Sequence, residues 1–254
     1  MLILNDNLKS IVKMLSYDIE GNINKNILII GKSGYGKTSL ARYISDLTNK
    51  SYILQYGFKY NLNNNYPINI IDEVHTVKEY EEFYRIMDLN LDGTGNKTLI
   101  FTTTHIGNLP EPFINRCFII DLGEYTKDEL FKIAKYYGYS YSDKILNEIV
   151  NRSRNTPRII VELILKLDMY KRYNTINEDN IDSTLDLFGV YKNGLTDIDK
   201  KYLNILQQFK SMSLNNMVKA LSVPKTTVEN YIEPYLIKMG LIKITTKGRV
   251  LNEN

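Results

Sequence analysis

The segment that most constrains the fold is residues 31–38, which read GKSGYGKT and match the phosphate-binding pattern G-x-x-x-x-G-K-[ST]. An apolar run at residues 26–30 precedes it and predicts a buried strand, and residues 39–44 begin a helical pattern. This order of strand, glycine-rich turn and helix places backbone N–H groups and a helix N-terminus around a phosphate. The alternative is a glycine-rich turn with a chance lysine, and the flanking strand and helix argue against it.

ATP and Mg²⁺ are the cofactors that this segment predicts. We expect the Lys37 side chain to neutralise the phosphates and the Thr38 hydroxyl to bind Mg²⁺. The residues expected to surround the nucleotide are Gly31, Ser33, Gly34, Tyr35, Gly36, Lys37, Thr38 and Ser39.

A second apolar strand, residues 69–71, ends in the acids Asp72 and Glu73. In a nucleotide hydrolase, the first acid is expected to bind Mg²⁺ and the second to polarise the attacking water. Alone, such a pair is an ordinary transition from strand to loop, but together with residues 31–38 it predicts a catalytic site. We expect His75 to be structural or to contact its neighbours rather than to bind a metal, because no Cys/His spacing in the chain supports a metal site.

Two more strands complete the predicted sheet. Residues 98–104 end in three threonines, of which Thr103 or Thr104 is expected to sense the γ-phosphate, although β-branched residues also suit any buried strand. Arg116 precedes the strand at residues 117–121. Such an arginine is usually a solvated surface residue, but in oligomeric ATPases it reaches the nucleotide of the neighbouring subunit.

Composition limits the class of protein. With 254 residues, 43% of them hydrophobic, the chain can bury a large core, and no apolar run approaches the ~18 residues of a membrane span. A single cysteine, Cys117, excludes an internal disulfide and fits a reducing compartment, so we expect a cytoplasmic protein without membrane contact. The net charge of +3 means that any nucleic-acid contact depends on a local basic patch.

The remaining sequence predicts two further domains. Residues 126–187 have a helical pattern that begins with a capping box at residues 126–129, and turn-forming residues follow at 189–194. After these come three expected helices at residues 199–209, 214–221 and 225–239, and two expected strands at 241–245 and 249–251. We therefore predict an α/β ATPase domain at residues 1–123, a small helical lid at 124–190 and a winged helix at 191–254.

Several motifs together resemble those of the AAA+ ATPases, and of the RuvB family of Holliday junction branch migration motors in particular. The order and spacing of residues 72–75, 102–105 and 109–116 are similar to that family, and Asn155–Ile159 resembles its Gly-Thr-Pro-Arg segment. The C-terminal third resembles the RuvB winged helix, which other AAA+ proteins lack. The resemblance implies an AAA+ P-loop fold with a lid and a winged helix, acting as a hexameric ring that moves DNA with ATP.

The resemblance also implies roles for individual residues. Lys37, Thr38, Asp72 and Glu73 take the nucleotide and Mg²⁺ roles, and Thr103 or Thr104 takes the sensor role. Arg116 becomes the finger that acts on the neighbouring subunit, Arg158 the lid sensor, and Arg249 a DNA contact. Further DNA contacts are expected at the start of the third helix and in the wing, from Lys225, Thr226, Thr227, Lys243 and Lys247. The alternative is that the winged helix only packs on the neighbouring parts of the protein and makes no DNA contact.

The chain also departs from the family. Lys32-Ser33, His105 and Ile114 replace residues usual in RuvB, and Asn115-Arg116-Cys117 also resembles the Ser-Arg-Cys of clamp-loader subunits. Residues 89–97 leave room only for a tight turn where RuvB has the hairpin that docks on RuvA, which puts a RuvA-like partner in doubt. A clamp-loader or helicase-loader subunit is therefore the alternative function, and a winged-helix transcription regulator is a third.

Overall fold

The computed structural model describes residues 3–252, and the chain divides into two compact units. The first unit extends to Tyr136 and also includes Thr156–Arg158. The second contains Tyr137–Asn155 and the chain from Ile159 onward, and so joins the lid helices and the winged helix. This division is coarser than the three domains predicted from the sequence, and the two units are described separately below.

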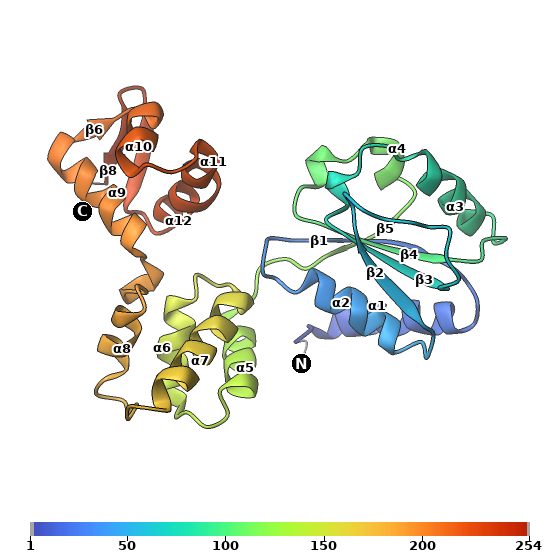
Figure 1. The fold of residues 1–254 in the computed structure, drawn as a ribbon, viewed down its shortest axis with the longest axis horizontal. Helices are drawn as coiled ribbons and strands as arrows, with labels where there is room; N and C mark the ends of the chain where they lie inside the picture. Colours follow the sequence, from blue (N-terminus) through green and yellow to red (C-terminus); the bar gives the residue numbers. More distant parts are fainter. Residues whose placement is uncertain (1–2, 253–254) are drawn as a thin grey trace. The chain divides into compact units, whose positions relative to one another are not determined.

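The first unit is built on a five-stranded parallel sheet in the order β2-β3-β4-β1-β5 (Figure 1). Its strands are β1 (Asn26–Ile30), β2 (Tyr52–Tyr56), β3 (Ile68–Asp72), β4 (Thr98–Thr103) and β5 (Phe118–Asp121). β1, β3 and β4 are almost wholly buried, because helices cover both faces of the sheet. The carboxyl ends of these three strands lie side by side, and this edge holds the residues predicted to bind nucleotide.

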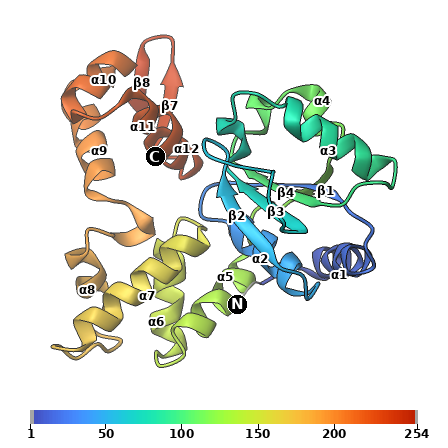
Figure 2. The same cartoon turned by 45° about the vertical axis from the view of Figure 1, so that its right-hand side comes forward.

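Helices pack on the two faces of the sheet in separate hydrophobic cores. The helices α1 (Asp6–Glu20) and α2 (Lys37–Asp46) cover one face, and α3 (Glu81–Leu91) and the short α4 (Glu111–Ile114) cover the other (Figures 1 and 2). The Asn5 side chain caps α1 by accepting a hydrogen bond from the Leu8 backbone N–H. Two single turns, η1 (Val74–Thr76) and η2 (Ile106–Asn108), follow the carboxyl ends of β3 and β4.

The connection between α3 and β4 is a tight turn, as predicted from residues 89–97. Asn90 stabilises it, because its side-chain amide donates to the Asn26 side chain at 2.7 Å and to the Lys97 carbonyl at 2.8 Å. No hairpin is inserted between these two elements.

The helix α5 (Lys127–Tyr137) lies almost entirely in the first unit. Its predicted capping box is confirmed, since the Thr126 backbone N–H donates to Glu129 at 2.8 Å and the Glu129 N–H donates to the Thr126 hydroxyl at 3.3 Å.

The second unit begins with the helix α6 (Asp143–Arg152), followed by α7 (Pro157–Lys171) from Ile159 onward and by α8 (Ile181–Leu187). The wholly buried Arg152 joins α6 to α8 through ion pairs with Glu148, Asp182 and Asp186. Arg154 ties this helical part to the winged helix, since its guanidinium pairs with the buried Asp199 and stacks on the Tyr235 ring at 4.1 Å.

The winged helix contains α9 (Asp197–Phe209), α10 (Leu214–Leu221), a third helix and a three-stranded antiparallel sheet. After the 3-10 turn η3 (Lys192–Gly194), Thr196 and Asp199 form a capping box that starts α9. The strands are β6 (Ser211–Met212), β7 (Ile242–Thr245) and β8 (Gly248–Leu251), in the order β6-β8-β7. β6 was not predicted, because two residues are too short to show an alternating pattern.

The third helix of the winged helix is continuous but irregular. It comprises α11 (Lys225–Thr227), a π-helical turn η4 (Val228–Ile232) and α12 (Glu233–Lys238). Pro234 explains the irregularity, because proline has no N–H to donate within a helix. The π-helical turn just before it lets the helix continue although this hydrogen bond is missing.

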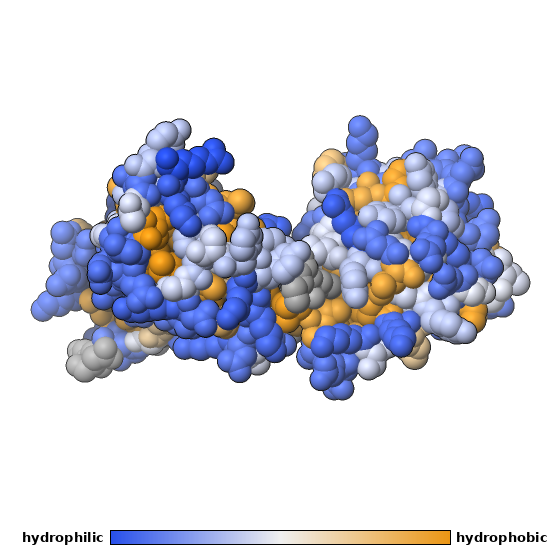
Figure 3. Space-filling view, turned by 90° about the horizontal axis from the view of Figure 1, so that it is seen from below, coloured by the Kyte–Doolittle hydropathy of each residue, from blue (hydrophilic) through white to orange (hydrophobic). Residues whose placement is uncertain are grey.

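No helix among residues 3–252 combines the length and the apolar character needed to cross a membrane. Figure 3 shows one face of the molecule, on which hydrophilic residues predominate and apolar residues form small separate patches.

Candidate functional site

The phosphate-binding loop depends on glycine at two positions. Gly34 and Gly36 have backbone φ angles of +78° and +91°, which residues with a side chain rarely adopt. A Cβ atom at Gly34 would also lie 2.9 Å from Thr156 Cγ2. Gly36 caps α2, so the loop passes directly into the N-terminus of that helix, where N–H groups are available to an anion.

Lys37 is the first residue of α2 and is 5% exposed. Its Nζ donates to the carbonyls of Gly31 at 3.0 Å and Lys32 at 3.2 Å. Burial lowers the pKa of Lys37, while the carboxylates of Glu73 and Asp72 act in the opposite direction. The loop therefore holds a partly desolvated cation, which favours a bound polyanion, and the two acids beside it favour a divalent cation.

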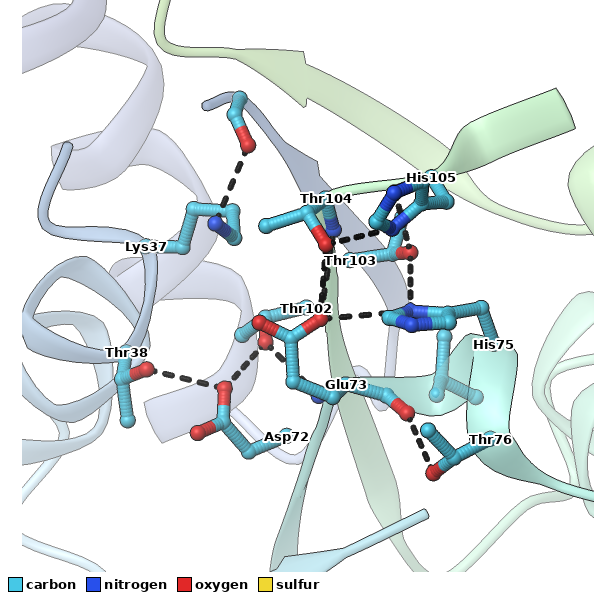
Figure 4. A network of polar contacts seen from close by, with 12 residues as sticks. Lys37, Thr38, Asp72, Glu73, His75, Thr76, Thr102, Thr103, Thr104 and His105 are labelled. Carbon is cyan, nitrogen blue, oxygen red and sulfur yellow. Dashed lines mark hydrogen bonds and ion pairs between the residues drawn. The ribbon is translucent and has the colours of Figure 1, made fainter. Parts of the chain in front are cut away.

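Thr38 and Asp72 lie together and supply oxygen ligands of the kind that Mg²⁺ prefers. The Thr38 hydroxyl donates to Asp72 Oδ1 at 2.9 Å, and the Thr102 hydroxyl donates to the same oxygen (Figure 4). Within residues 3–252 there is no cluster of three metal-binding His, Cys, Asp or Glu side chains. A hydroxyl and one carboxylate fit Mg²⁺ that takes its other ligands from phosphates and water, rather than a metal enclosed by the protein.

Glu73 follows Asp72 and is held from several sides. Its backbone has a φ of +52°, which turns the chain at the end of β3, and its N–H donates to the Thr102 hydroxyl at 3.3 Å. The Thr104 hydroxyl donates to Glu73 Oε2 at 3.1 Å, and Nδ1 of His75 lies 3.2 Å from the same oxygen (Figure 4). The carboxylate therefore has a defined position next to Asp72.

The two candidate sensor threonines have different contacts. The Thr104 hydroxyl contacts Glu73 and lies 2.7 Å from Nδ1 of His105, whereas the Thr103 hydroxyl lies 3.0 Å from Nδ1 of His75. Of these two threonines, only Thr104 contacts the Glu73 carboxylate. His75 contacts the candidate base directly, in agreement with the expectation that it is structural or contacts its neighbours, although the sequence did not show that Glu73 would be the neighbour.

Arg158 reaches the same site. It lies at the start of α7, and its backbone N–H donates to the Gly34 carbonyl at 3.3 Å. A cavity of about 150 Å³ is lined by Ser33, Gly34, Gly36, Lys37, Thr38, Ser39, Asp72, Glu73 and Arg158. The structure thus brings together most of the residues that the sequence predicted to surround the nucleotide.

Gly31 and Tyr35 are not among the residues that line this cavity. The Gly31 carbonyl accepts a hydrogen bond from Lys37. The Tyr35 side chain is buried, and its ring makes an edge contact with Tyr125 at 5.6 Å. The Tyr35 side chain therefore packs against the loop and Tyr125 and does not line the cavity. Its predicted nucleotide contact remains a proposal for its backbone alone.

Arg116 also lies outside the cavity lining. It follows α4, and its Nε pairs with Asp88 of α3 at 2.6 Å. The first unit by itself therefore provides Lys37 and Arg158 at the nucleotide cavity, but not Arg116.

The candidate DNA contacts of the winged helix are mostly at the surface. Lys225, Thr226, Lys243 and Lys247 are exposed, and Thr227 is half-buried. The Lys225 ammonium lies 3.6 Å from Glu229, a weak exposed pair that phosphate can replace. Lys247 also lines a hollow of about 610 Å³ with Lys219 and Phe209, so Lys219 is a further basic residue on this surface that sequence reasoning missed.

Arg249 is an exception to the predicted DNA contacts, and the geometry argues against its assignment. Its guanidinium binds the Glu233 carboxylate through two hydrogen bonds of 2.8 and 3.1 Å, and its side chain is 15% exposed. Tyr202, buried in α9, also donates to Glu233 at 2.9 Å. Hydrogen bonding to Glu233 raises the pKa of Arg249, so the residue is a charged link between β8 and α12 inside the domain.

The fold and this site define an AAA+ P-loop ATPase with a C-terminal winged helix. Residues 192–254 match the RuvB C-terminal winged helix domain. The Holliday junction branch migration complex subunits RuvB of Orientia tsutsugamushi and Campylobacter hominis are 31% and 33% identical. Each match covers 89% of this chain, with 82% and 77% of the respective relative.

A solved structure agrees with these relatives. The Thermotoga maritima RuvB Holliday junction branch migration motor is 26% identical, with a TM-score of 0.80 over 99% of this chain and 93% of that chain. The chain belongs to the RuvB family.

Proposed function

We propose that this protein is an ATP-driven motor on branched DNA, as the names of its relatives indicate for them. The observation that carries the proposal is the single cavity formed by the phosphate-binding loop, Asp72, Glu73 and Arg158, on a chain that ends in a RuvB winged helix. As a DNA-processing enzyme it would act in the cytoplasm.

The residues in and around the cavity have different roles in hydrolysis in this proposal. Glu73 accepts the proton of the attacking water, and Thr104 and His75 hold its carboxylate in place. Lys37 and Arg158 neutralise charge on the phosphates. Mg²⁺, held by Thr38 and Asp72, would supply further charge neutralisation on the phosphate oxygens when bound.

Arg116 completes the site from a neighbouring copy in this proposal. The residue lies outside the cavity of its own chain and is one-third exposed, as a group that acts on another subunit must be. The assembly would be a ring of identical subunits, which we propose to be a hexamer.

The winged helix would hold the DNA backbone through Lys225, Thr226, Thr227, Lys243 and Lys247, with Lys219 beside them. Such contacts position the protein on DNA without reading its sequence. The tight turn between α3 and β4 leaves no hairpin for a RuvA-like partner, so we propose that recruitment occurs in another way.

ATP turnover measured with three DNA ligands tests this function. We expect a four-way junction to stimulate ATP turnover more than plain duplex or primed template does. We also expect the junction to be converted into two duplexes by branch migration only when Glu73 is intact. Matched protein carrying Glu73→Gln should bind the junction without moving it.

The alternative function, a clamp-loader or helicase-loader subunit, is favoured by the missing hairpin. It predicts strongest stimulation by primed template and no junction movement. Either of those results would replace the motor with a loader.

A further inference from the structure

Arg116 is held by three groups of its own chain. Its Nε donates to Asp88 Oδ1 at 2.6 Å, and its Nη1 donates to the Pro112 carbonyl at 2.9 Å. The guanidinium carbon lies 5.1 Å from the centre of the Tyr84 ring. A carboxylate, a carbonyl and an aromatic face therefore fix both the position and the plane of the guanidinium.

The helix α3 supplies two of these three groups. Tyr84 and Asp88 are four residues apart, so they lie one above the other on the same helix face. An arginine fork that is stacked and hydrogen-bonded has lost most of its side-chain freedom before it meets a ligand.

The backbone of Arg116 is anchored as well. The buried side chain of Asn26, at the start of β1, donates to the Arg116 carbonyl at 3.2 Å and to the Met87 carbonyl at 3.0 Å. Asn26 thus connects the Arg116 main chain to the segment of α3 that contains Asp88.

The ion pair between Arg116 and Asp88 contributes little to the stability of the fold, so stability does not explain it. The side chains of Arg116 and Asp88 are 31% and 51% exposed, and ion pairs in such positions are weak. Nη2 of Arg116 forms no hydrogen bond or ion pair with any residue between 3 and 252. The guanidinium is thus held by its Nε and Nη1, and its Nη2 edge is left for another molecule.

We propose that Asp88 and Tyr84 are positioning residues, which hold Arg116 in the orientation that the nucleotide of a neighbouring copy requires. This inference rests on the proposed function, because it assumes that Arg116 acts on another subunit. A preset guanidinium meets the γ-phosphate without first having to be ordered, and a small misplacement of such a group is costly to the rate. Asp88 and Tyr84 do not touch the nucleotide themselves.

Loss of Asp88 should therefore lower kcat and leave the KM for ATP unchanged. For Asp88→Asn we expect kcat to fall by about 10- to 100-fold, in the range typical of misplaced catalytic groups. Asp92→Asn is the matched control, since it removes an exposed acid four residues further along and should leave kcat unchanged.

Mixed assemblies test the inference separately from the proposed function. Copies with Glu73→Gln keep the finger but cannot hydrolyse ATP, and copies with Arg116→Ala keep the cavity but lack the finger. The two are co-expressed with different tags and purified through both, so that every assembly contains each kind. We expect the mixture to recover turnover that neither variant has alone.

Asp88→Asn is then added to one kind of copy at a time. On the Glu73→Gln copy, which donates the finger, it should lower the recovered kcat by the same 10- to 100-fold. On the Arg116→Ala copy, which has no arginine to hold, it should change nothing.

Each other outcome has a defined meaning. A mixture that recovers no turnover would remove the role of Arg116 in trans, and with it both the proposed site and this inference. Recovery that is insensitive to Asp88→Asn on the donating copy would overturn the positioning role while the trans site stands. An equal loss from Asp88→Asn on either copy would make Asp88 a structural residue and also overturn the inference.

Discussion

The nucleotide cavity and the winged helix differ in how their polar residues are arranged. In the cavity, the predicted residues contact one another, as Thr38 does with Asp72 and Thr104 with Glu73. In the winged helix, the predicted lysines are dispersed over an exposed surface, and the predicted arginine is bound inside the domain.

The difference reflects what each site must bind. A triphosphate is enclosed by backbone N–H groups and a few side chains, which requires particular glycines, a lysine and a hydroxyl at fixed spacing. A DNA backbone is held by exposed positive charge, which many arrangements of lysine can supply. Sequence motifs therefore define the first kind of site much better than the second.

The largest expected effect tests the enclosed site. Lys37→Ala should lower ATP turnover by at least about 100-fold, because it removes a buried cation from the phosphates. The measurement is steady-state phosphate release with saturating ATP and junction DNA. Lys32→Ala is the control, since that lysine is in the same loop but points to Glu124 at the surface, and turnover should change little. Equal losses in both variants would mean that the loop tolerates no change and that Lys37 has no special role.

The next effect tests whether Arg249 is internal. Arg249→Ala should destabilise the protein by about 3–5 kcal/mol, because it leaves the Glu233 carboxylate, 4% exposed, without its charge partner. Urea unfolding followed by circular dichroism measures this loss. Lys247→Ala, two residues away and exposed, should change the free energy of unfolding by less than about 0.5 kcal/mol.

A double variant sharpens this result. Arg249→Met with Glu233→Gln removes both charges but keeps an oxygen that accepts from the buried Tyr202 hydroxyl, and neutral replacements of buried pairs often cost little. We expect most of the lost stability to return. If the double variant is as unstable as Arg249→Ala, then packing rather than the ion pair explains the effect.

The sequence predicted the fold well where local pattern determines structure. The strands that carry Asp72 and Thr103, the cap at Thr126 and the second winged-helix segment, residues 214–221, are as expected, because apolar periodicity and capping residues act over a few positions. The position of the nucleotide site followed for the same reason, since its motifs lie at the ends of adjacent parallel strands.

What the sequence did not predict depends on partners distant in the chain. Arg249 pairs with a residue 16 positions earlier, and Arg116 with one 28 positions earlier, and no short-range pattern marks either pair. His75 was expected to be structural or to contact its neighbours, and it does contact them, but no spacing in the sequence marks the turn at Glu73 that brings it to the Glu73 carboxylate.

The smallest expected effect concerns the DNA surface. Lys225→Ala and Lys247→Ala should each weaken junction binding and lower the slope of log affinity against log salt by about 1, because each lysine neutralises about one phosphate. Fluorescence anisotropy at several salt concentrations gives this slope. Lys201→Ala, which removes an exposed lysine from α9, should leave it unchanged. The Arg249→Met, Glu233→Gln double variant belongs in the same series, because it is expected to fold. If it keeps the parental slope, Arg249 supports the domain and the lysines hold the DNA; a slope lowered by about 1 would restore Arg249 as a DNA contact, and would mean that its pair with Glu233 opens when DNA binds.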